Sequence, residues 1–189
     1  EDPHTRQCEA LFRELFDAPV ETLLAFNGTG ANVLALAMLL GPGEAVVCTE
    51  QAHIAVDETG APERYLGAKL IDVPTTDGKL RPEHLDGLAH LLGVQHHVQP
   101  GVVSITQSTE LGGLYSIEEI TALCDAAHRL GMRVHLDGAR LANATAALGG
   151  SVDTLRAMTI GAGVDVVSFG GTKNGLLGGE AVVVCDPAR

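Results

Sequence analysis

The chain contains no tryptophan, and aromatic residues make up only 3% of its 189 residues. Because the hydrophobic fraction is 46%, the core has to be built mainly from leucine, valine and alanine. That fraction and the ordinary content of charged residues exclude an intrinsically disordered chain. The length favours one globular domain with enough chain to bury a core.

Basic residues are scarce, since 12 lysines and arginines face 24 acidic residues and give a formal net charge of −12. No cluster of lysine or arginine occurs, so the sequence argues against nucleic acid and anionic membranes as partners. Long hydrophobic runs are also missing. The longest, at residues 33–40, is far below the roughly 20 residues of a membrane-spanning helix, and no signal peptide is recognisable.

Neither a disulfide framework nor a metal-binding spacing is present. The cysteines lie far apart without a C-x-x-C pair, and three of them fall in apolar runs or a helical pattern, so we expect buried thiols and a cytoplasmic location. Four histidines show no metal-ligand spacing; we expect them to be structural or exposed and predict no metal site. These residues are Cys8, Cys48, Cys124 and Cys185, and His84, His90, His96 and His97.

Apolar residues recur with helical spacing in some segments and form short continuous runs in others. We expect helices at residues 4–17, 28–40, 82–92, 116–130, 140–148 and 151–159, and strands at 21–26, 45–48, 69–73, 102–106, 133–136, 164–169 and 180–185. Continuous apolar strands that alternate with helices are typical of a sheet covered on both faces. The sequence therefore predicts an α/β domain with a mostly parallel central sheet flanked by helices.

Several polar or glycine-rich positions fall where these strands end: the turn at Gly28, residues 106–107, Asp137 and Lys173. In parallel sheets, ligands gather at the carboxyl ends of the strands. These positions are distant in the sequence, yet such a sheet would bring them to one edge.

Asp137 ends an apolar strand, and Lys173 follows a later strand among glycines. Taken singly, the acid could pair with Arg140 at the surface, and a lysine in a loop usually faces solvent. Together they match a pyridoxal phosphate (PLP) enzyme, in which a lysine holds the aldehyde as a Schiff base and an acid keeps the pyridine nitrogen protonated. Lys173 would then need a desolvated, glycine-lined pocket in which its amine can lose a proton.

The segment Gly28-Thr29-Gly30 links a strand to a helix. Free N–H groups at such a helix start attract a phosphate, to which Thr29 could add a hydrogen bond. The plain alternative is a glycine turn with Thr29 as the helix cap. Val33 replaces the third glycine of a dinucleotide fingerprint, and no P-loop motif occurs, so a nucleotide-binding domain is disfavoured.

Three further residues could serve such a site. Arg140 carries a planar fork suited to a substrate carboxylate. His53 could stack on a planar cofactor ring or relay a proton, although a surface or core histidine is the usual finding. His135 lies two residues before Asp137 and shares its face of the strand, where it could support the site.

Five ordered motifs, which together cover nearly the whole chain, resemble low-specificity L-threonine aldolase, in the β-eliminating lyase branch of fold-type-I PLP enzymes. The motifs are Asn27-Gly28-Thr29-Gly30-Ala31-Asn32, Glu50-Gln51-Ala52-His53-Ile54, Thr106-Gln107-Ser108-Thr109-Glu110-Leu111-Gly112, His135-Leu136-Asp137-Gly138-Ala139-Arg140 and Ser168-Phe169-Gly170-Gly171-Thr172-Lys173-Asn174-Gly175. The resemblance implies retro-aldol cleavage of L-threonine and L-allo-threonine to glycine and acetaldehyde, by a homodimer or homotetramer.

The resemblance also implies a role for each candidate residue. Lys173 would bind the cofactor aldehyde, Asp137 would face the pyridine nitrogen, and Gly28–Thr29 would hold the phosphate. His53 would stack on the ring and assist the base step, and Arg140 would bind the substrate carboxylate.

The chain departs from the family in two ways. Glu110 stands where many members carry a histidine, so a proton-transfer role for a second histidine is in doubt. Members are also longer at both ends and have a C-terminal small domain, so we expect residues 1–189 to be a truncated PLP-binding large domain. The rival hypotheses are another fold-type-I PLP lyase or aminotransferase, and an inactive fragment that serves as a binding or assembly module.

Overall fold

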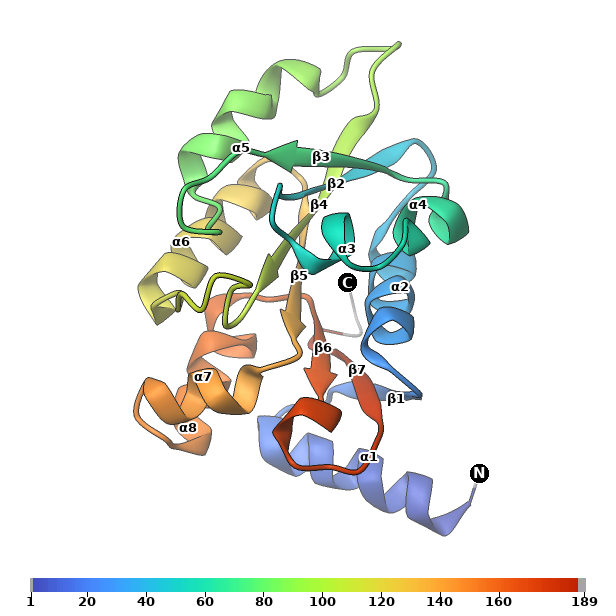
Figure 1. Ribbon diagram of the computed structural model, residues 1–189, viewed down its shortest axis with the longest axis vertical. Helices are drawn as coiled ribbons and strands as arrows, with labels where there is room; N and C mark the ends of the chain where they lie inside the picture. Colours follow the sequence, from blue (N-terminus) through green and yellow to red (C-terminus); the bar gives the residue numbers. More distant parts are fainter. Residues whose placement is uncertain (1, 187–189) are drawn as a thin grey trace.

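A seven-stranded sheet runs through the computed structural model, which describes residues 2–186 (Figure 1). The strands are β1 (Glu21–Ala25), β2 (Glu44–Thr49), β3 (Lys69–Val73), β4 (Gln99–Thr106), β5 (Arg133–Gly138), β6 (Val166–Gly170) and β7 (Glu180–Val184), in the order β1-β7-β6-β5-β4-β2-β3. The five strands from β6 to β3 are parallel, and β7 is antiparallel to both of its neighbours. The predicted α/β architecture with a mostly parallel sheet is confirmed.

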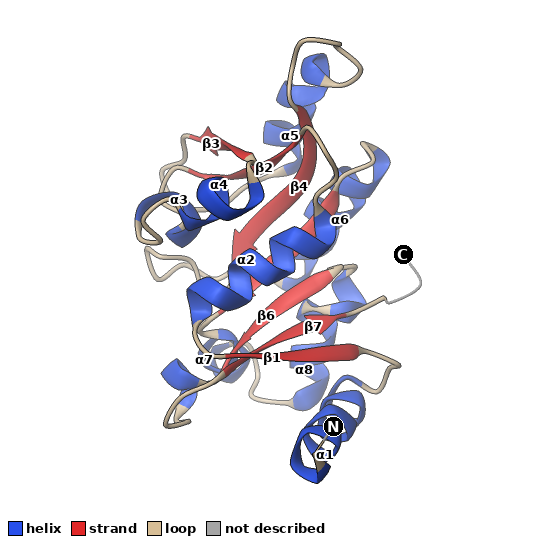
Figure 2. Cartoon of the chain, turned by 90° about the vertical axis from the view of Figure 1, so that its right-hand side faces the viewer, coloured by secondary structure: helices blue, strands red, loops and turns tan. Residues whose placement is uncertain are grey.

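Helices cover both faces of this sheet. They are α1 (Pro3–Phe16), α2 (Gly28–Leu39), α3 (His53–Val56), α4 (Ala61–Leu66), α5 (Pro82–Leu88), α6 (Ile117–Arg129), α7 (Leu141–Ala147) and α8 (Val152–Met158), with 3-10 turns η1 (Ala89–Leu91), η2 (Ile160–Ala162) and η3 (Thr172–Asn174). Helix α2 lies across one face (Figure 2), where its Leu36 joins a buried cluster with Val46 and Val166. The opposite face buries Val47 and Leu136 with side chains of α5 to α8. Successive residues of a strand therefore pack into the cores on opposite faces of the sheet, as the continuous apolar runs predict.

Helix starts follow capping signals in the sequence. Ser116 and Glu119 form the reciprocal capping box of α6, with hydrogen bonds of 3.2 and 2.7 Å. At α2 the cap is Asn27, whose Oδ1 accepts the N–H of Gly30 at 2.8 Å. The alternative in which Thr29 caps this helix is therefore wrong, and its hydroxyl is not used in that way.

The sequence patterns did not predict α3 and α4. Helices of 4 and 6 residues are too short to show a helical repeat, and glycines in the left-handed region flank α4. The expected burial of three thiols is confirmed, because Cys48, Cys124 and Cys185 are buried and free, and burial raises the pKa of each to about 12. Within residues 2–186, no helix has the length and apolar character needed to cross a membrane.

The last residue of β6 is predicted to tolerate only glycine. A Cβ at Gly170 would lie 2.6 Å from the Cα and the carbonyl oxygen of Ala139, which are backbone atoms that no side-chain rotation can move away. We expect Gly170→Ala to lower the free energy of unfolding by about 1–3 kcal/mol, as overpacking does. Urea unfolding measures this, with Gly87→Ala as the control, since a Cβ at Gly87 meets no atom within 4 Å. Equal stability of the two variants would contradict the predicted clash.

Candidate active site

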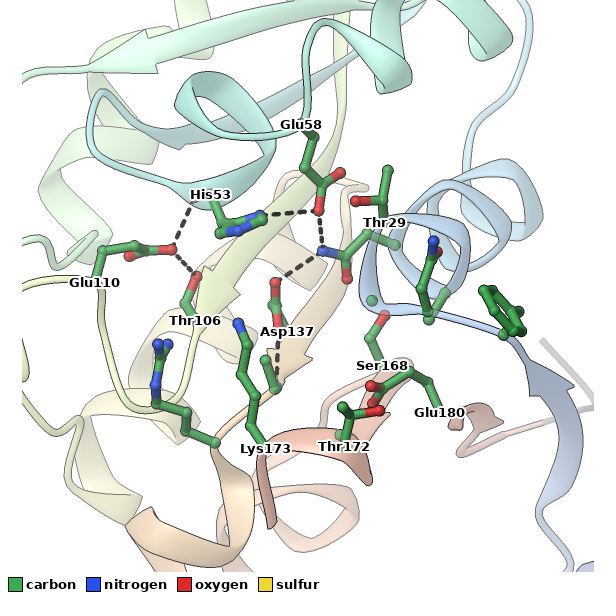
Figure 3. Close-up of a pocket in the computed structure, with 18 of the residues that line it drawn as sticks. Thr29, His53, Glu58, Thr106, Glu110, Asp137, Ser168, Thr172, Lys173 and Glu180 are labelled. Carbon is green, nitrogen blue, oxygen red and sulfur yellow. Dashed lines mark hydrogen bonds and ion pairs between the residues drawn. The ribbon is translucent and has the colours of Figure 1, made fainter. Parts of the chain in front are cut away.

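A cavity of about 420 Å³ opens at the carboxyl ends of the strands (Figure 3). All the residues predicted from the sequence to bind cofactor or substrate line it: Gly28, Thr29, His53, Asp137, Arg140 and Lys173. None of His84, His90, His96 and His97 is among the lining residues. The volume of the cavity is typical of small-molecule sites, which span roughly 300–1,000 Å³. The parallel sheet thus brings together six residues that span 146 positions of the chain (28 to 173).

Asp137 is the acidic residue that the sequence predicted for the cofactor site. Its side chain is buried, with 4% of the residue exposed. Oδ1 accepts the N–H of Ala139 at 2.9 Å, and Oδ2 accepts an N–H of Asn32 at 2.8 Å. No cationic side chain within residues 2–186 pairs with it. A buried carboxylate without a cation is costly, so this position suits a ligand group that carries a proton and a positive charge.

Two buried residues that the sequence reasoning did not single out connect Asp137 with His53. Asn32 donates its second amide N–H to Glu58 Oε1 at 2.8 Å, and the same oxygen lies 3.1 Å from His53 Nδ1. Asn32 could have been found, because it follows Gly28 by four residues on a helix and therefore shares its face. Glu58 lies in the turn between α3 and α4, and no periodic signal marks such a residue.

Glu110 fixes the main chain of His53. Its Oε1 accepts the backbone N–H of His53 and the hydroxyl of Thr106, both at 2.8 Å. Helix α3 has no side-chain cap from its own N-cap residue Ala52, so this carboxylate supplies the missing acceptor. In this chain the position therefore holds the neighbouring histidine in place.

Lys173 lies in the 3-10 turn after β6, and its side chain extends into the cavity (Figure 3). The turn is held by Glu180, whose Oε2 accepts the N–H of Gly171 at 2.7 Å, and by Asn174, whose amide donates to the carbonyl of Gly170 at 2.7 Å. Lys173 is exposed. The desolvated surroundings expected for its amine are therefore not supplied by residues 2–186 alone.

The start of α2 leaves room for an anion beside the cavity. Because Asn27 satisfies only Gly30 by its side chain, the N–H groups of Gly28 and Thr29 have no acceptor within the helix. No atom lies within 4 Å of the place where a Cβ of Gly28 would be, so a ligand can approach the backbone closely. The lysine, the cation-free carboxylate and this helix start are the three groups that PLP requires, and the cavity residues therefore fit this cofactor.

Arg140 is exposed at the start of α7. Its guanidinium makes no hydrogen bond or ion pair with the part of the chain that the structure describes. A guanidinium without a protein partner at the edge of the cavity is available for an anionic group of a ligand.

His135 lies fully buried in the sheet and joins three neighbouring strands. Its Nδ1 lies 2.9 Å from Ser104 Oγ on β4, and its Nε2 lies 2.9 Å from Ser168 Oγ on β6. Burial lowers the pKa of His135 to about 4, an effect that the nearby Asp137 carboxylate opposes. The imidazole is therefore neutral near pH 7 and serves as a polar link beneath the cavity.

Comparisons with known proteins identify relatives of this chain. The family model described as "Beta-eliminating lyase" matches residues 1–188. The "Low specificity L-threonine aldolase" of Pseudomonas aeruginosa is 44% identical over 97% of this chain and 52% of its own length, and that of a Pseudomonas species is 42% identical over the same shares. A solved threonine aldolase of Leishmania major superposes with a TM-score of 0.90 at 33% identity, over 100% of this chain and 55% of its own. The chain thus spans about half the length of these relatives.

The buried imidazole of His135 predicts a loss of stability in acid. Its folded-state pKa of about 4 lies below the ordinary 6.5, so between these values the unfolded chain binds a proton that the folded chain does not. Stability should therefore fall as the pH falls from 6.5 to 4, by on the order of 3 kcal/mol. Unfolding in urea at a series of pH values measures this slope.

In His135→Gln, the slope between pH 6.5 and 4 should become markedly flatter, because the titrating group is gone. The control is His90→Gln, which removes an exposed histidine and should leave the slope unchanged. An equally steep slope in His135→Gln and wild type would show that another group causes the acid sensitivity.

Proposed function

The chain belongs to the beta-eliminating lyase family, and on this basis we propose that it acts in a PLP-dependent aldolase. The proposed reaction converts L-threonine, L-allo-threonine and related β-hydroxy-α-amino acids to glycine and an aldehyde by cleavage of the Cα–Cβ bond. The family's enzymes are PLP-dependent. The observation that carries the proposal is the meeting of Asp137, Lys173 and the start of α2 in one cavity.

Each cofactor-binding residue has a distinct task in this proposal. The backbone of Gly28 and Thr29 holds the phosphate, and the Thr29 hydroxyl adds a hydrogen bond. Asp137 would hold the ring nitrogen and supply the negative charge that favours its protonated form. Lys173 would hold the cofactor through its aldehyde; the other two lysines, Lys69 and Lys79, do not line the cavity. When bound, PLP supplies a conjugated ring that accepts the electron pair released by the breaking bond.

The remaining residues act on the substrate. Arg140 binds the substrate carboxylate through its planar fork and so orients the amino acid. His53 takes the proton of the β-hydroxyl group as the Cα–Cβ bond breaks and the aldehyde leaves. A proton is then delivered to Cα, so the atoms of threonine are divided between glycine and acetaldehyde without loss.

We also propose the setting in which the chain works. Four free thiols support a reducing, cytoplasmic compartment. A homodimer or homotetramer is supported by the exposure of Lys173 and by apolar side chains beside the cavity, because Phe26, which lines it, is 92% exposed. A second subunit at this side would supply the desolvation that the described residues leave incomplete.

Lys173→Ala tests the assignment of the covalent lysine. With PLP added, wild type should develop the visible absorbance of a lysine–cofactor bond and release acetaldehyde from L-threonine. The variant should lose both, because no other lysine lines the cavity. Lys69→Ala, a change at an exposed lysine on β3, should retain both. Colour and turnover that persist in Lys173→Ala would refute the assignment.

The same assay separates the rival activities. An aminotransferase would yield a keto acid, a β-eliminating enzyme of other specificity would yield ammonia, and a binding or assembly module would yield no product. Release of acetaldehyde and glycine in equal amounts is the result that the aldolase proposal predicts.

Arg140→Lys tests the proposed substrate contact. Lysine keeps the charge but loses the bidentate geometry, so KM for L-threonine should rise by roughly 10- to 100-fold with a smaller change in kcat. Arg129→Lys is the matched control, because Arg129 is exposed and pairs with Asp86 away from the cavity. An unchanged KM in Arg140→Lys would show that another group binds the carboxylate.

A further inference from the structure

We propose that Glu58 is a positioning residue of this site, which fixes both the ring of His53 and, through Asn32, the carboxylate of Asp137. The inference rests on the proposed function for its effect on catalysis. Its physical core, the hold of Glu58 on two side chains, stands on the contacts of this chain alone.

Glu58 is the centre of a continuous chain of contacts, drawn as dashed lines in Figure 3. Its Oε1 accepts an N–H of Asn32 at 2.8 Å and lies 3.1 Å from His53 Nδ1. The other N–H of the same amide is donated to Asp137 Oδ2 at 2.8 Å. One carboxylate thus connects the proposed proton-transfer residue with the residue proposed to face the cofactor nitrogen.

The residues connected by these contacts are almost fully buried. Glu58 and Asn32 are each 2% exposed, and Asp137 is 4% exposed. Hydrogen bonds between buried polar groups are strong, and a buried group left without one is costly. Within residues 2–186, Glu58 Oε2 and Asn32 Oδ1 have no hydrogen-bond partner. A buried acid that is only partly satisfied by its own chain is a feature of binding sites more than of inert cores.

The residue after Glu58 has an unfavourable backbone conformation. Thr59 has a φ of 51° and Gly60 a φ of 70°, both in the left-handed region. That region is unfavourable for a β-branched residue such as threonine, and strain of this kind is retained where the surrounding structure demands it. The turn between α3 and α4 therefore holds an unfavourable conformation at the residue that follows Glu58.

The contacts fix the state of the histidine. Glu58 Oε1 already accepts an N–H of Asn32, so we infer that it also acts as the acceptor toward His53 and that Nδ1 carries the proton. In the neutral ring, Nε2 then keeps its lone pair, which is the form that can take a proton from a substrate hydroxyl. Glu110 holds the backbone of His53 and so sets its position, and Glu58 sets its tautomer.

A merely structural brace between α2 and the α3–α4 segment would behave differently. A buried ion pair can often be replaced by an apolar side chain of similar volume without loss of stability. If Glu58 only fills space, Glu58→Leu should leave the histidine ring and the catalytic constants unchanged. If it positions His53 and Asn32, the same substitution should alter both in a protein that remains folded.

The experiment compares wild type, Glu58→Leu and Glu58→Gln, with Glu63→Leu and Glu63→Gln as matched controls at an exposed glutamate of α4. Nitrogen-15 NMR of the His53 ring, in protein without added PLP, reports the tautomer. Steady-state kinetics with PLP and L-threonine report kcat and KM, and thermal unfolding checks that each variant is folded.

We expect wild-type His53 to show one tautomer, protonated at Nδ1. In Glu58→Leu the ring should exchange between tautomers, and kcat should fall by roughly 10- to 100-fold while KM stays within roughly threefold. Glu58→Gln keeps an acceptor oxygen and should restore the single tautomer and much of kcat. The controls should match wild type in every measurement.

A single Nδ1-protonated tautomer together with unchanged kcat in Glu58→Leu would overturn the inference. If that variant does not fold, Glu58→Asp takes its place, because withdrawing the carboxylate by one methylene group should have the same effect on the ring and on kcat. The NMR measurement needs neither cofactor nor substrate. A wild-type protein that releases no acetaldehyde would contradict the proposed function. If its His53 nevertheless shows one tautomer that depends on Glu58, the result would support the positioning role.

Discussion

The site depends on the buried carboxylate of Asp137, which forms an ion pair with no cationic side chain within residues 2–186. Asp137 receives N–H groups from Ala139 and Asn32, and these hydrogen bonds orient it without cancelling its charge. Burial of a charged carboxylate is unfavourable unless a cation pairs with it. In the proposed function, the protonated pyridine nitrogen of PLP would supply that cation, so cofactor binding would stabilise the buried acid.

The sheet explains how a chain of this composition assembles the cavity. Parallel strands place all their carboxyl ends at one edge, where β4, β5 and β6 deliver Thr106, Asp137 and the turn that carries Lys173. Acidic side chains then hold individual parts of this edge: Glu180 binds the lysine turn, and Glu110 binds the backbone of His53. Much of the acidic character near the cavity is therefore used to position other groups.

The strands, the longer helices and the residues at strand ends could be predicted, because hydrophobic periodicity and glycine turns are local signals. The parallel topology then implied that Gly28, Asp137 and Lys173 would meet. Glu58 could not be found in this way, since its approach depends on the strained turn at Thr59 and on packing against α2. The desolvated pocket expected for Lys173 is not formed by the described residues, because the glycines around a residue do not determine its exposure to solvent.

The central claim is that Lys173 and Asp137 hold one cofactor ring between them. The most direct measurement is borohydride reduction of the chain with bound PLP, followed by mass spectrometry of its peptides. The chain has three lysines, at positions 69, 79 and 173. Reduced cofactor attached to Lys173 alone, and lost when Asp137 is replaced by alanine, is the predicted result. Cofactor attached to either of the other lysines, or labelling that ignores Asp137, would contradict the claim.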